Sequence, residues 1–545
     1  MTPEQKETGK GNFARVVGKL AEADQQAHAP QGITRRRFMQ GLVAAGATVP
    51  VSAAAYFGYR SHGFPGTTRP VKAAIIGCGD EGGVLVGAHN PNFVKFVAYS
   101  DIRPYNQKRI FAGEPTGPRL GFNHHYGADA KRTIRLEEDY HAILRDPEIE
   151  MVVIALPLNL HAKVTIEALE AGKHVLCEKL MAWNITQCKQ MIRAADRANR
   201  LLSIGHQRHY SMLYAHANEV VNTGVLGDIK HIRALWHRNN VRPNPDTASN
   251  RDRPMLDSWW PNIPADDRNL SLETIRAAGF KDLNELVRWR LYTRTGGGLM
   301  AELGSHQLDA CSIFLGKKKP LSVTAVGGTH FYQDNREVED HVYCIYEFPG
   351  LNYNDRDPRS RKNDIITVTY SSISTNGFEP YGECIMGSKG TLIVETEQNA
   401  YLYGLAGRST QVTATAASGG TIVDASSTAP ADARASAAGQ SAAALTGQNA
   451  VGHNAPSRGY REEMEHLAYC IRMREEGMEA DRDQLKPRCD GRAAMADAII
   501  ALTANQAMKN RARIDFRREW FEVNADPTRD AQEVPDADMR EEAVS

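Results

Sequence analysis

The chain has 545 residues, and its 65 Lys and Arg residues balance its 65 Asp and Glu residues. A chain of this length exceeds one ordinary hydrophobic core, so we expect two domains with appended segments. The balanced charge disfavours nucleic acid or an anionic membrane surface as a partner and favours small neutral or locally charged ligands. The 8 cysteines are scattered, without a C-x-x-C pair, which predicts buried thiols and no disulfide framework.

Residues 1–68 are expected to be a leader and linker. The first 31 residues are polar and weakly periodic, which is typical of a disordered segment. Residues 34–40, Thr-Arg-Arg-Arg-Phe-Met-Gln, precede a mildly apolar stretch that contains Pro50 and is too weak to be a convincing membrane span. This pattern is typical of a twin-arginine export signal, with a basic amphipathic tail as the alternative. We therefore expect the twin-arginine machinery to deliver the protein to the periplasm or cell envelope, with the segment cleaved or kept as an anchor.

Residues 69–205 begin with a strand and a glycine-rich turn. The apolar run 71–76 leads directly into Gly-Cys-Gly-Asp-Glu-Gly, a G-x-G-x-x-G match between a predicted strand and a predicted helix. Gly77 permits the tight turn, Gly79 lets a pyrophosphate approach the backbone, and Gly82 lets the helix pack on the strand. The phosphates would lie at the helix N-terminus, where free amides and the helix dipole favour anions.

An acidic residue follows the second predicted strand, 93–99. Asp101 lies at the distance from the last glycine where an acid receives the hydroxyls of the adenosine ribose, which favours NAD. Arg103 would instead meet a 2′-phosphate, so NADP is the alternative. Helices and apolar strands then alternate, as in a doubly wound parallel sheet, with helices at 136–145 and 161–171 and strands at 150–156 and 174–177.

Two loops follow the carboxyl ends of predicted strands, where ligands bind in such sheets. They are residues 157–161 and 178–180. A cation at Lys179, beside a nicotinamide, would stabilise alkoxide charge on the hydroxyl being oxidised, and an ordinary surface lysine is the alternative. The expected cofactor-binding residues are Gly77, Gly79, Asp80, Glu81, Gly82, Asp101, Arg103, Pro157, Asn159, His161, Glu178 and Lys179.

Three polar residues recur at helical spacing after the glycine-rich stretch 296–298. Glu302, His306 and Asp309 are separated by four and then three residues, so on a helix they share one face. The imidazole of His306 has an ordinary pKa of about 6.5 and suits proton transfer near neutrality. A solvated helix face is the alternative. A metal site is not expected, because no Cys or second His lies at ligand spacing.

Residues 206–404 predict a second domain with an α+β fold and a mostly antiparallel open sheet. Its strands are expected at 229–237, 321–331, 341–348, 365–371, 382–386 and 390–395. Residues 405–457 are rich in Ala, Ser, Gly and Thr and predict a low-complexity loop. Residues 458–545 would supply the C-terminal helices of this domain, at 462–475 and 490–509, and an acidic tail.

A polar insertion at 238–295 interrupts this second domain. Trp289, Arg290 and Tyr292 suit stacking on a sugar ring and binding of its hydroxyls, although they are equally ordinary packing residues. Arg208 is added as a further candidate for substrate binding.

Three motifs together resemble the Gfo/Idh/MocA oxidoreductase family, which includes glucose-fructose oxidoreductase and inositol dehydrogenase. They are the glycine turn, the segment Ala-Gly-Lys-His-Val-Leu-Cys-Glu-Lys at 171–179, and Gly-Gly-Gly followed by the polar helix. The resemblance implies that Lys179 matches the lysine of a Glu-Lys-Pro motif and that His306 handles the proton of the substrate hydroxyl. Leu180 replaces the usual Pro, and Glu302 replaces the usual Asp. The resemblance also implies a homo-oligomer formed through the free face of the second sheet.

We therefore expect an exported NAD(P)-dependent oxidoreductase that transfers hydride between a secondary alcohol of a sugar or cyclitol and a nicotinamide. Its catalytic residues would be Lys179, His306, Glu302 and Asp309. The nucleotide should be tightly bound, because the periplasm holds no pool of free NAD(H) to exchange. The alternatives are a redox-neutral, NAD-assisted glycosidase or lyase, and a non-catalytic sugar-binding envelope protein.

Overall fold

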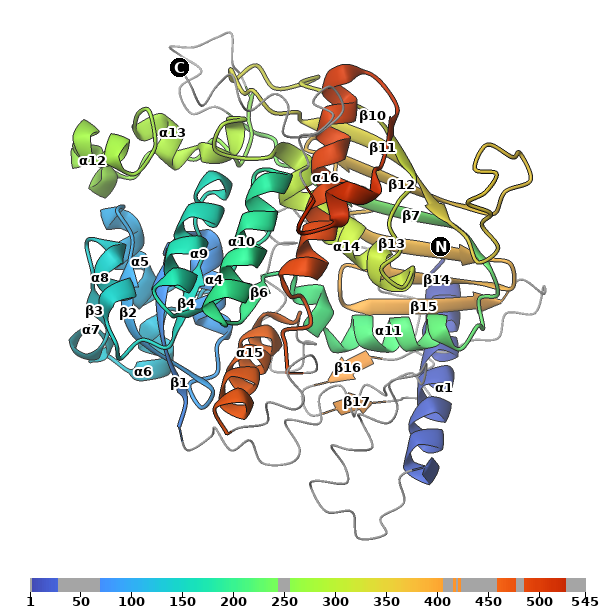
Figure 1. The fold of residues 1–545 in the computed structure, drawn as a ribbon, viewed down its shortest axis with the longest axis horizontal. Helices are drawn as coiled ribbons and strands as arrows, with labels where there is room; N and C mark the ends of the chain where they lie inside the picture. The colour runs from blue at the N-terminus through green and yellow to red at the C-terminus, as the bar shows by residue number, and fades with distance from the viewer. Residues whose placement is uncertain are drawn as a thin grey trace.

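The computed structural model describes residues 2–27, 69–243, 255–404, 415–417, 420–422, 458–476 and 485–525. Two sheets dominate these residues, one at the left of Figure 1 and a larger one at the right. The twin-arginine motif and most of the expected low-complexity loop lie outside the described residues. Inside that loop, β16 (Thr415–Ala417) and β17 (Gly420–Ile422) form a short antiparallel pair.

The first sheet is parallel throughout and has the strand order β3-β2-β1-β4-β5-β6. The order changes direction at β1, so the carboxyl ends of β1 and β4 flank a crevice of the kind that binds ligands in doubly wound sheets. This confirms the predicted Rossmann-type fold. The strands are β1 (Val71–Ile76), β2 (Val94–Ser100), β3 (Arg135–Leu136), β4 (Met151–Ile154), β5 (His174–Cys177) and β6 (Leu202–Ile204).

Helices connect these strands. One expected helix starts later than predicted, because Arg135–Leu136 pairs with β2 and the Asp139 side chain accepts a hydrogen bond from the His141 amide, which caps the helix there. The helices are α4 (Asp80–Ala88), α5 (Pro104–Ala112), α6 (Phe122–Tyr126), α7 (Ala130–Thr133), α8 (Tyr140–Arg145), α9 (His161–Glu170) and α10 (Ile185–Ala198).

The second sheet has the order β15-β14-β13-β7-β12-β11-β10-β18 and is antiparallel except for the pair β7 and β12. This confirms the predicted α+β domain with a mostly antiparallel sheet. Its strands are β7 (Ile229–His237), β10 (Ser322–Gly328), β11 (His341–Pro349), β12 (Ile365–Ile373), β13 (Tyr381–Gly387), β14 (Gly390–Glu395), β15 (Asn399–Gly404) and β18 (Ile514–Asp515).

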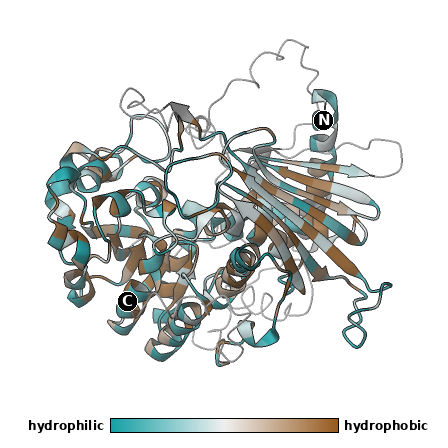
Figure 2. Cartoon of the chain, turned by 90° about the horizontal axis from the view of Figure 1, so that it is seen from above, coloured by the Kyte–Doolittle hydropathy of each residue, from teal (hydrophilic) through white to brown (hydrophobic). Residues whose placement is uncertain are grey.

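Helices cover one face of this sheet. They are α11 (Met212–Asn222), α14 (Ser305–Phe314) and α16 (Gly491–Asn510), which pack against strands of the sheet. Along β11, buried and exposed residues alternate, which is the pattern of a sheet with one face in the core. Figure 2 shows the resulting apolar bands across the strands. The opposite face exposes Val326, Tyr343 and Ile345.

The two C-terminal helices pack in different places, although both were expected in the second domain. Helix α15 (Tyr460–Glu475) buries Met464, Leu467 and Ile471 in the core around the first sheet. Its apolar face packs towards the first sheet, where it contacts α4 and β1. Helix α16 instead contacts β10 and α14, as well as α10 of the first domain.

The N-terminal residues form a helix, so the expectation of a disordered leader is wrong over this range. Helix α1 (Pro3–Ala27) packs against the edge strand β15. Its Phe13 and Val17 are buried, and the Asn12 amide donates to the main-chain oxygen of Leu402 at 3.0 Å. The weak periodicity of this stretch did not predict a helix. The helix depends on its docking against β15 rather than on intrinsic propensity.

A segment of the insertion, residues 255–295, folds across the edge of the first domain, and we call it the cover segment. Ile275, Phe280 and Leu286 form a small core with Ile102 and Leu160 of the first domain. The segment therefore closes over the carboxyl ends of the parallel strands (Figure 1). Its elements are β9 (Met255–Leu256), which pairs with β8 (Arg242–Pro243), then η4 (Ala265–Asn269), α12 (Leu272–Ala277), α13 (Leu283–Val287) and η5 (Trp289–Leu291).

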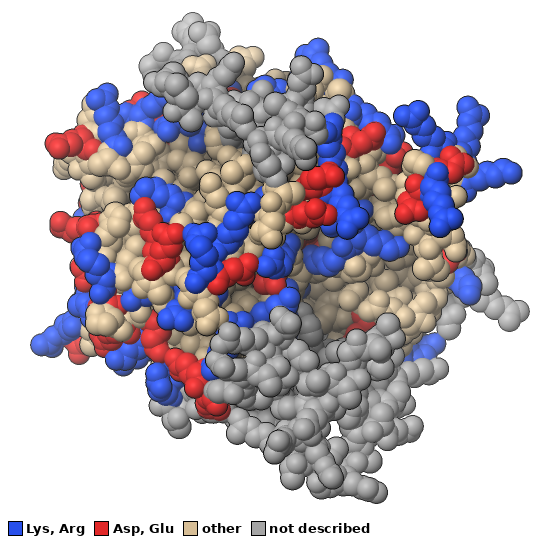
Figure 3. All heavy atoms as spheres, in the orientation of Figure 1, with Lys and Arg blue, Asp and Glu red and all other residues tan. Residues whose placement is uncertain are grey.

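The surface of the described residues is mixed in charge. On the face drawn in Figure 3, Lys and Arg side chains are interspersed with Asp and Glu side chains. Among the described helices, none combines the length and the apolar character that crossing a bilayer requires.

Candidate active site

A cavity of about 1240 Å³ lies between the first domain, the cover segment and the second domain. The loops after β1, β2, β4 and β5 line it on one side, and the end of β7 and the start of α14 line it on the other. A volume this large accommodates a dinucleotide together with a small substrate, since drug-sized ligands occupy roughly 300–1,000 Å³.

The glycine turn has the geometry that a dinucleotide requires. Gly77 has a φ of +94°, and a Cβ at that position would lie 2.2 Å from the main-chain oxygen of Ala155. A Cβ on Gly82 would lie 2.2 Å from the oxygen of Gly77, so this glycine is needed where helix meets strand. A Cβ on Gly79 would have no neighbouring atom within 4 Å, so the space beside this residue has room for a phosphate.

Two arginines stand beside this turn. The Asp80 carboxylate accepts a hydrogen bond from Arg109 at 2.8 Å and lies 3.9 Å from Arg119. Burial raises the pKa of Asp80, but the two guanidinium groups outweigh burial and bring it to about 2. The charged Asp80 therefore holds two cations at the mouth of the helix N-terminus, where a pyrophosphate would lie.

The end of the cavity that follows β2, where the adenosine of a dinucleotide would lie, contains Asp101 and an ion pair. Asp101 accepts hydrogen bonds from the amides of Cys78 and Arg103, each at 2.7 Å. The Arg103 guanidinium donates to the fully buried carboxylate of Asp267 in the cover segment at 2.9 Å. Asp267 also accepts from the Tyr105 amide at 3.0 Å. Arg103 is therefore engaged by the cover segment.

Lys179 and Glu302 join the two domains at the other end of the cavity. The Lys179 ammonium donates to the main-chain oxygen of Glu302 at 3.1 Å, and the Glu302 carboxylate accepts from Arg290 Nε at 2.8 Å. Burial raises the pKa of Glu302, but Lys179 and Arg290 outweigh burial and lower it. Glu302 is therefore charged. Its side chain, one methylene longer than that of the Asp it replaces, reaches Arg290.

His306 borders the same cavity and is 7% exposed. Its Nδ1 is buried without a partner among the described residues, so Nε2 is the nitrogen available to the cavity. The ring lies 5.5 Å from the Trp236 ring, between centroids. Burial, followed by the charge of Lys179, lowers the pKa of His306 well below its ordinary value. The imidazole is therefore neutral at neutral pH and able to accept a proton.

Two further residues, His161 and Glu178, lie near Lys179, at the end of the cavity where a nicotinamide would lie. The ring nitrogens of His161 lie 2.8 Å from the main-chain oxygens of Leu156 and Leu180, so this histidine ties two cavity loops. Burial and the neighbouring carboxyl of Glu81 raise the pKa of Glu178 well above its ordinary value. The raised pKa favours the uncharged form of Glu178 and so reduces negative charge beside Lys179.

The structure brings most of the predicted residues to this one cavity. Five of them lie outside its lining: Gly82, Asn159, Arg208, Tyr292 and Asp309. Those that line it are Gly77, Gly79, Asp80, Glu81, Asp101, Arg103, Pro157, His161, Glu178, Lys179, Trp289, Arg290, Glu302 and His306.

Arg208 was expected to contact substrate, and its position contradicts this. It is 1% exposed, and its guanidinium donates to Glu397 at 2.7 Å and contacts Glu383 at 3.5 Å. The guanidinium is therefore engaged by two buried acidic side chains beneath the cavity, and removing it would leave them without this partner.

Asp309 was expected to orient substrate and the His306 ring, and it points elsewhere. His306 and Asp309 both lie in α14, about 60° apart around the helix, and it is the partners of Asp309 that hold it away from the cavity. Its carboxylate is bonded to His209 at 2.7 Å and to Lys317 at 2.8 Å. Burial raises the pKa of Asp309, but His209 and Lys317 outweigh burial and lower it.

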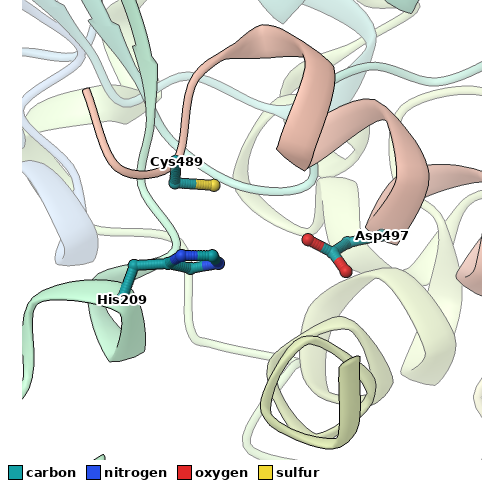
Figure 4. Close-up of side chains that lie close together, drawn as sticks. All are labelled: His209, Cys489 and Asp497. Carbon is teal, nitrogen blue, oxygen red and sulfur yellow. The ribbon is translucent and has the colours of Figure 1, made fainter. Parts of the chain in front are cut away.

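The same buried cluster contains three potential metal ligands. Side-chain atoms of His209, Cys489 and Asp497 lie within 4.8 Å of one another (Figure 4). The Lys317 ammonium lies 3.1 Å from His209 and 3.4 Å from Asp497, so it already supplies a positive charge to these groups. A divalent ion would have to displace this lysine, and we assign no metal to the cluster.

Sequence reasoning missed several polar and aromatic residues of the cavity, among them Arg109 and Arg119 beside the glycine turn and four residues near His306. Trp236 and Arg238 lie at the end of β7, and only the predicted strand 229–237 pointed to that position. Tyr381 stacks on Trp236 at 4.7 Å between ring centroids, and Arg458 comes from beyond the low-complexity stretch. No local motif marks these last two residues.

The fold and this site together define a protein with a dinucleotide-binding domain whose site is completed by a second domain. A family model described as an oxidoreductase family with an NAD-binding Rossmann fold matches residues 71–206, and one for the GFO/IDH/MocA C-terminal domain matches residues 272–393. Both domains thus match models of the Gfo/Idh/MocA oxidoreductase family, and the first is an NAD-binding Rossmann domain.

Relatives and solved structures agree with this assignment. A scyllo-inositol 2-dehydrogenase (NADP(+)) of Bacillus subtilis is 25% identical over 52% of this chain and 61% of its own length. An uncharacterized oxidoreductase of Schizosaccharomyces pombe is 25% identical over 46% of this chain and 54% of its own length. The chain thus spans about half to three fifths of the length of these curated relatives.

Two solved structures share the fold. An inositol dehydrogenase homolog from Azotobacter vinelandii, complexed with NAD+, is 17% identical, with a TM-score of 0.55 over 82% of this chain and 97% of that chain. An aldose-aldose oxidoreductase from Caulobacter crescentus, complexed with glycerol, is 19% identical, with a TM-score of 0.51 over 82% of this chain and 100% of that chain.

Proposed function

We propose that this protein is an NAD-dependent oxidoreductase that transfers hydride between a secondary alcohol of a sugar or cyclitol and a nicotinamide. The observation that carries the proposal is the contact of Lys179 with the main chain of Glu302, because it brings the ammonium and His306 to the same cavity as the glycine turn. Relatives named as inositol dehydrogenases support a polyhydroxylated substrate.

The residues of the cavity divide the work of alcohol oxidation. When bound, NAD supplies the nicotinamide ring that accepts the hydride. His306 Nε2 takes the proton of the substrate hydroxyl as the carbon–hydrogen electron pair leaves and the carbonyl bond forms. The Lys179 ammonium stabilises negative charge on the substrate oxygen during this step. Glu302 positions Lys179 through its main-chain oxygen and Arg290 through its carboxylate.

Tight retention of the nucleotide is part of the proposal. The cover segment is anchored over the adenosine end by Asp267, which binds both Arg103 and the Tyr105 amide, and by a pair between Asp266 and Lys108. Release of a dinucleotide would require these contacts and the small core around Phe280 to open. Slow release suits a protein that works where no nucleotide pool exists.

The reaction is tested by mixing the purified protein with polyols and sugars while following nicotinamide absorbance, and by analysing the products. A keto sugar or lactone formed with reduction of the nucleotide supports the proposal. Cleavage of a glycosidic bond without net oxidation would favour the redox-neutral glycosidase or lyase. A protein that binds sugar with no spectral change and no product would be a non-catalytic binding protein.

We also propose export by the twin-arginine route. The support is the Thr-Arg-Arg-Arg-Phe-Met-Gln sequence at 34–40 and the state of the cysteines, all eight of which are buried and outside any disulfide. A protein that folds in the reducing cytoplasm before translocation does not depend on disulfides. Replacing Arg35 and Arg36 by Lys should keep the protein in the cytoplasm, and unchanged export would contradict the route.

Self-association is proposed through the open face of the second sheet. Val326 and Tyr343 are cross-strand neighbours on that face, and Ile345 lies next to them, all well exposed. A contiguous apolar face of this kind marks an interaction surface. Light scattering should report a homo-oligomer that Ile345→Lys dissociates, and a monomeric wild-type protein would contradict the proposal.

A further inference from the structure

Arg238 has a guanidinium group that lines the cavity and is only partly engaged by the protein. Its Nε and Nη2 are buried and have no hydrogen-bond partner among the described residues. The group is nevertheless held in place, because it lies over the Trp259 ring at 5.3 Å and its amide donates to the Ile373 oxygen at 2.9 Å. Buried polar groups are paired in roughly 90% of cases or more, so an unpaired one that lines a cavity points to a ligand.

The acids near Arg238 are already bonded to other arginines. Asp257 accepts from Arg336 at 2.9 Å and from the Trp259 amide at 3.0 Å. Glu302 accepts from Arg290. Neither carboxylate accepts a hydrogen bond from Arg238, so the positive charge of Arg238 is not matched by a direct ion pair within the described part of the chain.

The position of Arg238 relative to the catalytic groups is set by β7. Trp236 lies in β7 and packs beside His306, and Arg238 is the first residue after β7 ends at His237; both side chains line the cavity. Two residues of an extended strand span about 7 Å. A sugar ring that rests against Trp236, with a hydroxyl at His306, would therefore present an exocyclic group to Arg238.

We propose that Arg238 binds a carboxylate of the substrate, so that the substrate is a sugar acid, such as a hexuronic acid, rather than a neutral sugar. The adjacent Nε and Nη2 donors form the planar fork that matches the two oxygens of a carboxylate. A neutral hydroxymethyl group offers one oxygen and no charge, and would leave part of the fork unpaired. This inference rests on the function proposed above.

The test compares acids with their neutral counterparts on the NAD-loaded full-length protein. The pairs are D-glucuronate with D-glucose and D-galacturonate with D-galactose, and glucose 6-phosphate is the phosphate probe. Calorimetry gives affinity, and nicotinamide absorbance gives kcat/KM. We expect at least one acid to exceed its neutral partner in affinity by about ten-fold or more, as a charge-assisted pair provides.

Substitutions test whether Arg238 is the source of the preference for the acid over the neutral sugar. Arg238→Gln should remove the advantage of the acid, by about ten- to hundred-fold, while affinity for the neutral partner changes less than about three-fold. Arg233→Gln is the matched control, because Arg233 lies on β7, just before Arg238 in the chain, is exposed and pairs with Glu379. It should keep the preference of the wild-type protein.

Each contrary result has a distinct meaning. Equal affinity for acid and neutral sugar, no binding of any acid, or a preference for the phosphate would overturn the carboxylate assignment. Equal losses for both sugars in Arg238→Gln, or loss of NAD from that variant, would make Arg238 a packing or cofactor residue and overturn it as well. Acid binding that depends on Arg238 without any reduction of NAD would support the inference while contradicting the proposed reaction.

Discussion

The ammonium of Lys179 donates to the main-chain oxygen of Glu302 at 3.1 Å, and this bond links the loop after β5 to the π-helical turn before α14. The two residues are 123 positions apart in sequence. Because of this contact, the cation of the first domain and the imidazole of the second border one cavity, and neither domain contains the reactive site alone.

Replacing His306 tests the proposed proton acceptor. His306→Asn should lower the rate of hydride transfer by about 10²–10⁴-fold, since this is the usual contribution of a general base. Nucleotide content, measured after denaturation, should stay unchanged, because His306 makes no hydrogen bond to the glycine turn among the described residues. A variant with normal turnover would remove His306 from the mechanism.

The pH dependence of kcat/KM follows from the state of this histidine. Burial and Lys179 lower its pKa, so the imidazole stays neutral and able to accept a proton as the pH falls through about 6.5, the ordinary value. The acid limb of the profile should therefore lie below about pH 6.5, and activity should be flat through neutrality. An acid limb centred at or above this value, and missing from the His306→Asn variant, would contradict the lowered pKa of His306.

Asp267 is expected to determine the choice of nucleotide. In Asp267→Asn the ion pair with Arg103 is lost, and the freed guanidinium can meet a 2′-phosphate. The affinity for NADP relative to NAD should rise by about ten-fold, the scale of one charge-assisted hydrogen bond. Asp266→Asn, which removes only a surface pair with Lys108, is the control. An unchanged ratio in Asp267→Asn would show that the cover segment has no part in this selectivity.

Arg208 should matter for stability rather than for substrate affinity. Arg208→Met leaves the buried carboxylates of Glu397 and Glu383 without this partner and should lower the free energy of unfolding by about 3–5 kcal/mol. Arg518→Ala, at an exposed pair with Glu522, should cost less than about 1 kcal/mol. Urea denaturation measures both. A stable Arg208→Met protein with weakened substrate binding would restore the original expectation.

The sequence was sufficient to predict both sheets and the glycine turn, because these depend on local patterns. An apolar strand followed by glycines at fixed spacing predicts the turn, and alternating apolar residues predict strands such as β11. Helix α1 could not be predicted in this way, since it is held by β15, where Leu402 lies 390 residues beyond its partner Asn12.

The site was only partly predictable for the same reason. Lys179 and His306 belong to motifs, whereas Arg238 and Arg458 reach the cavity through long-range packing that no local pattern encodes. A uniform helix was assumed for residues 302–309, but a π-helical turn at Met300–Gly304 shifts Glu302 relative to His306. Asp309 does not border the cavity because His209 and Lys317, which are distant in sequence, bond its carboxylate.

The most direct test of the account is to denature the purified protein and identify the nucleotide that it releases. We predict close to one NAD or NADH per chain, retained through gel filtration because the cover segment closes the cavity. Protein that releases no nucleotide and does not bind added NAD or NADP would contradict it.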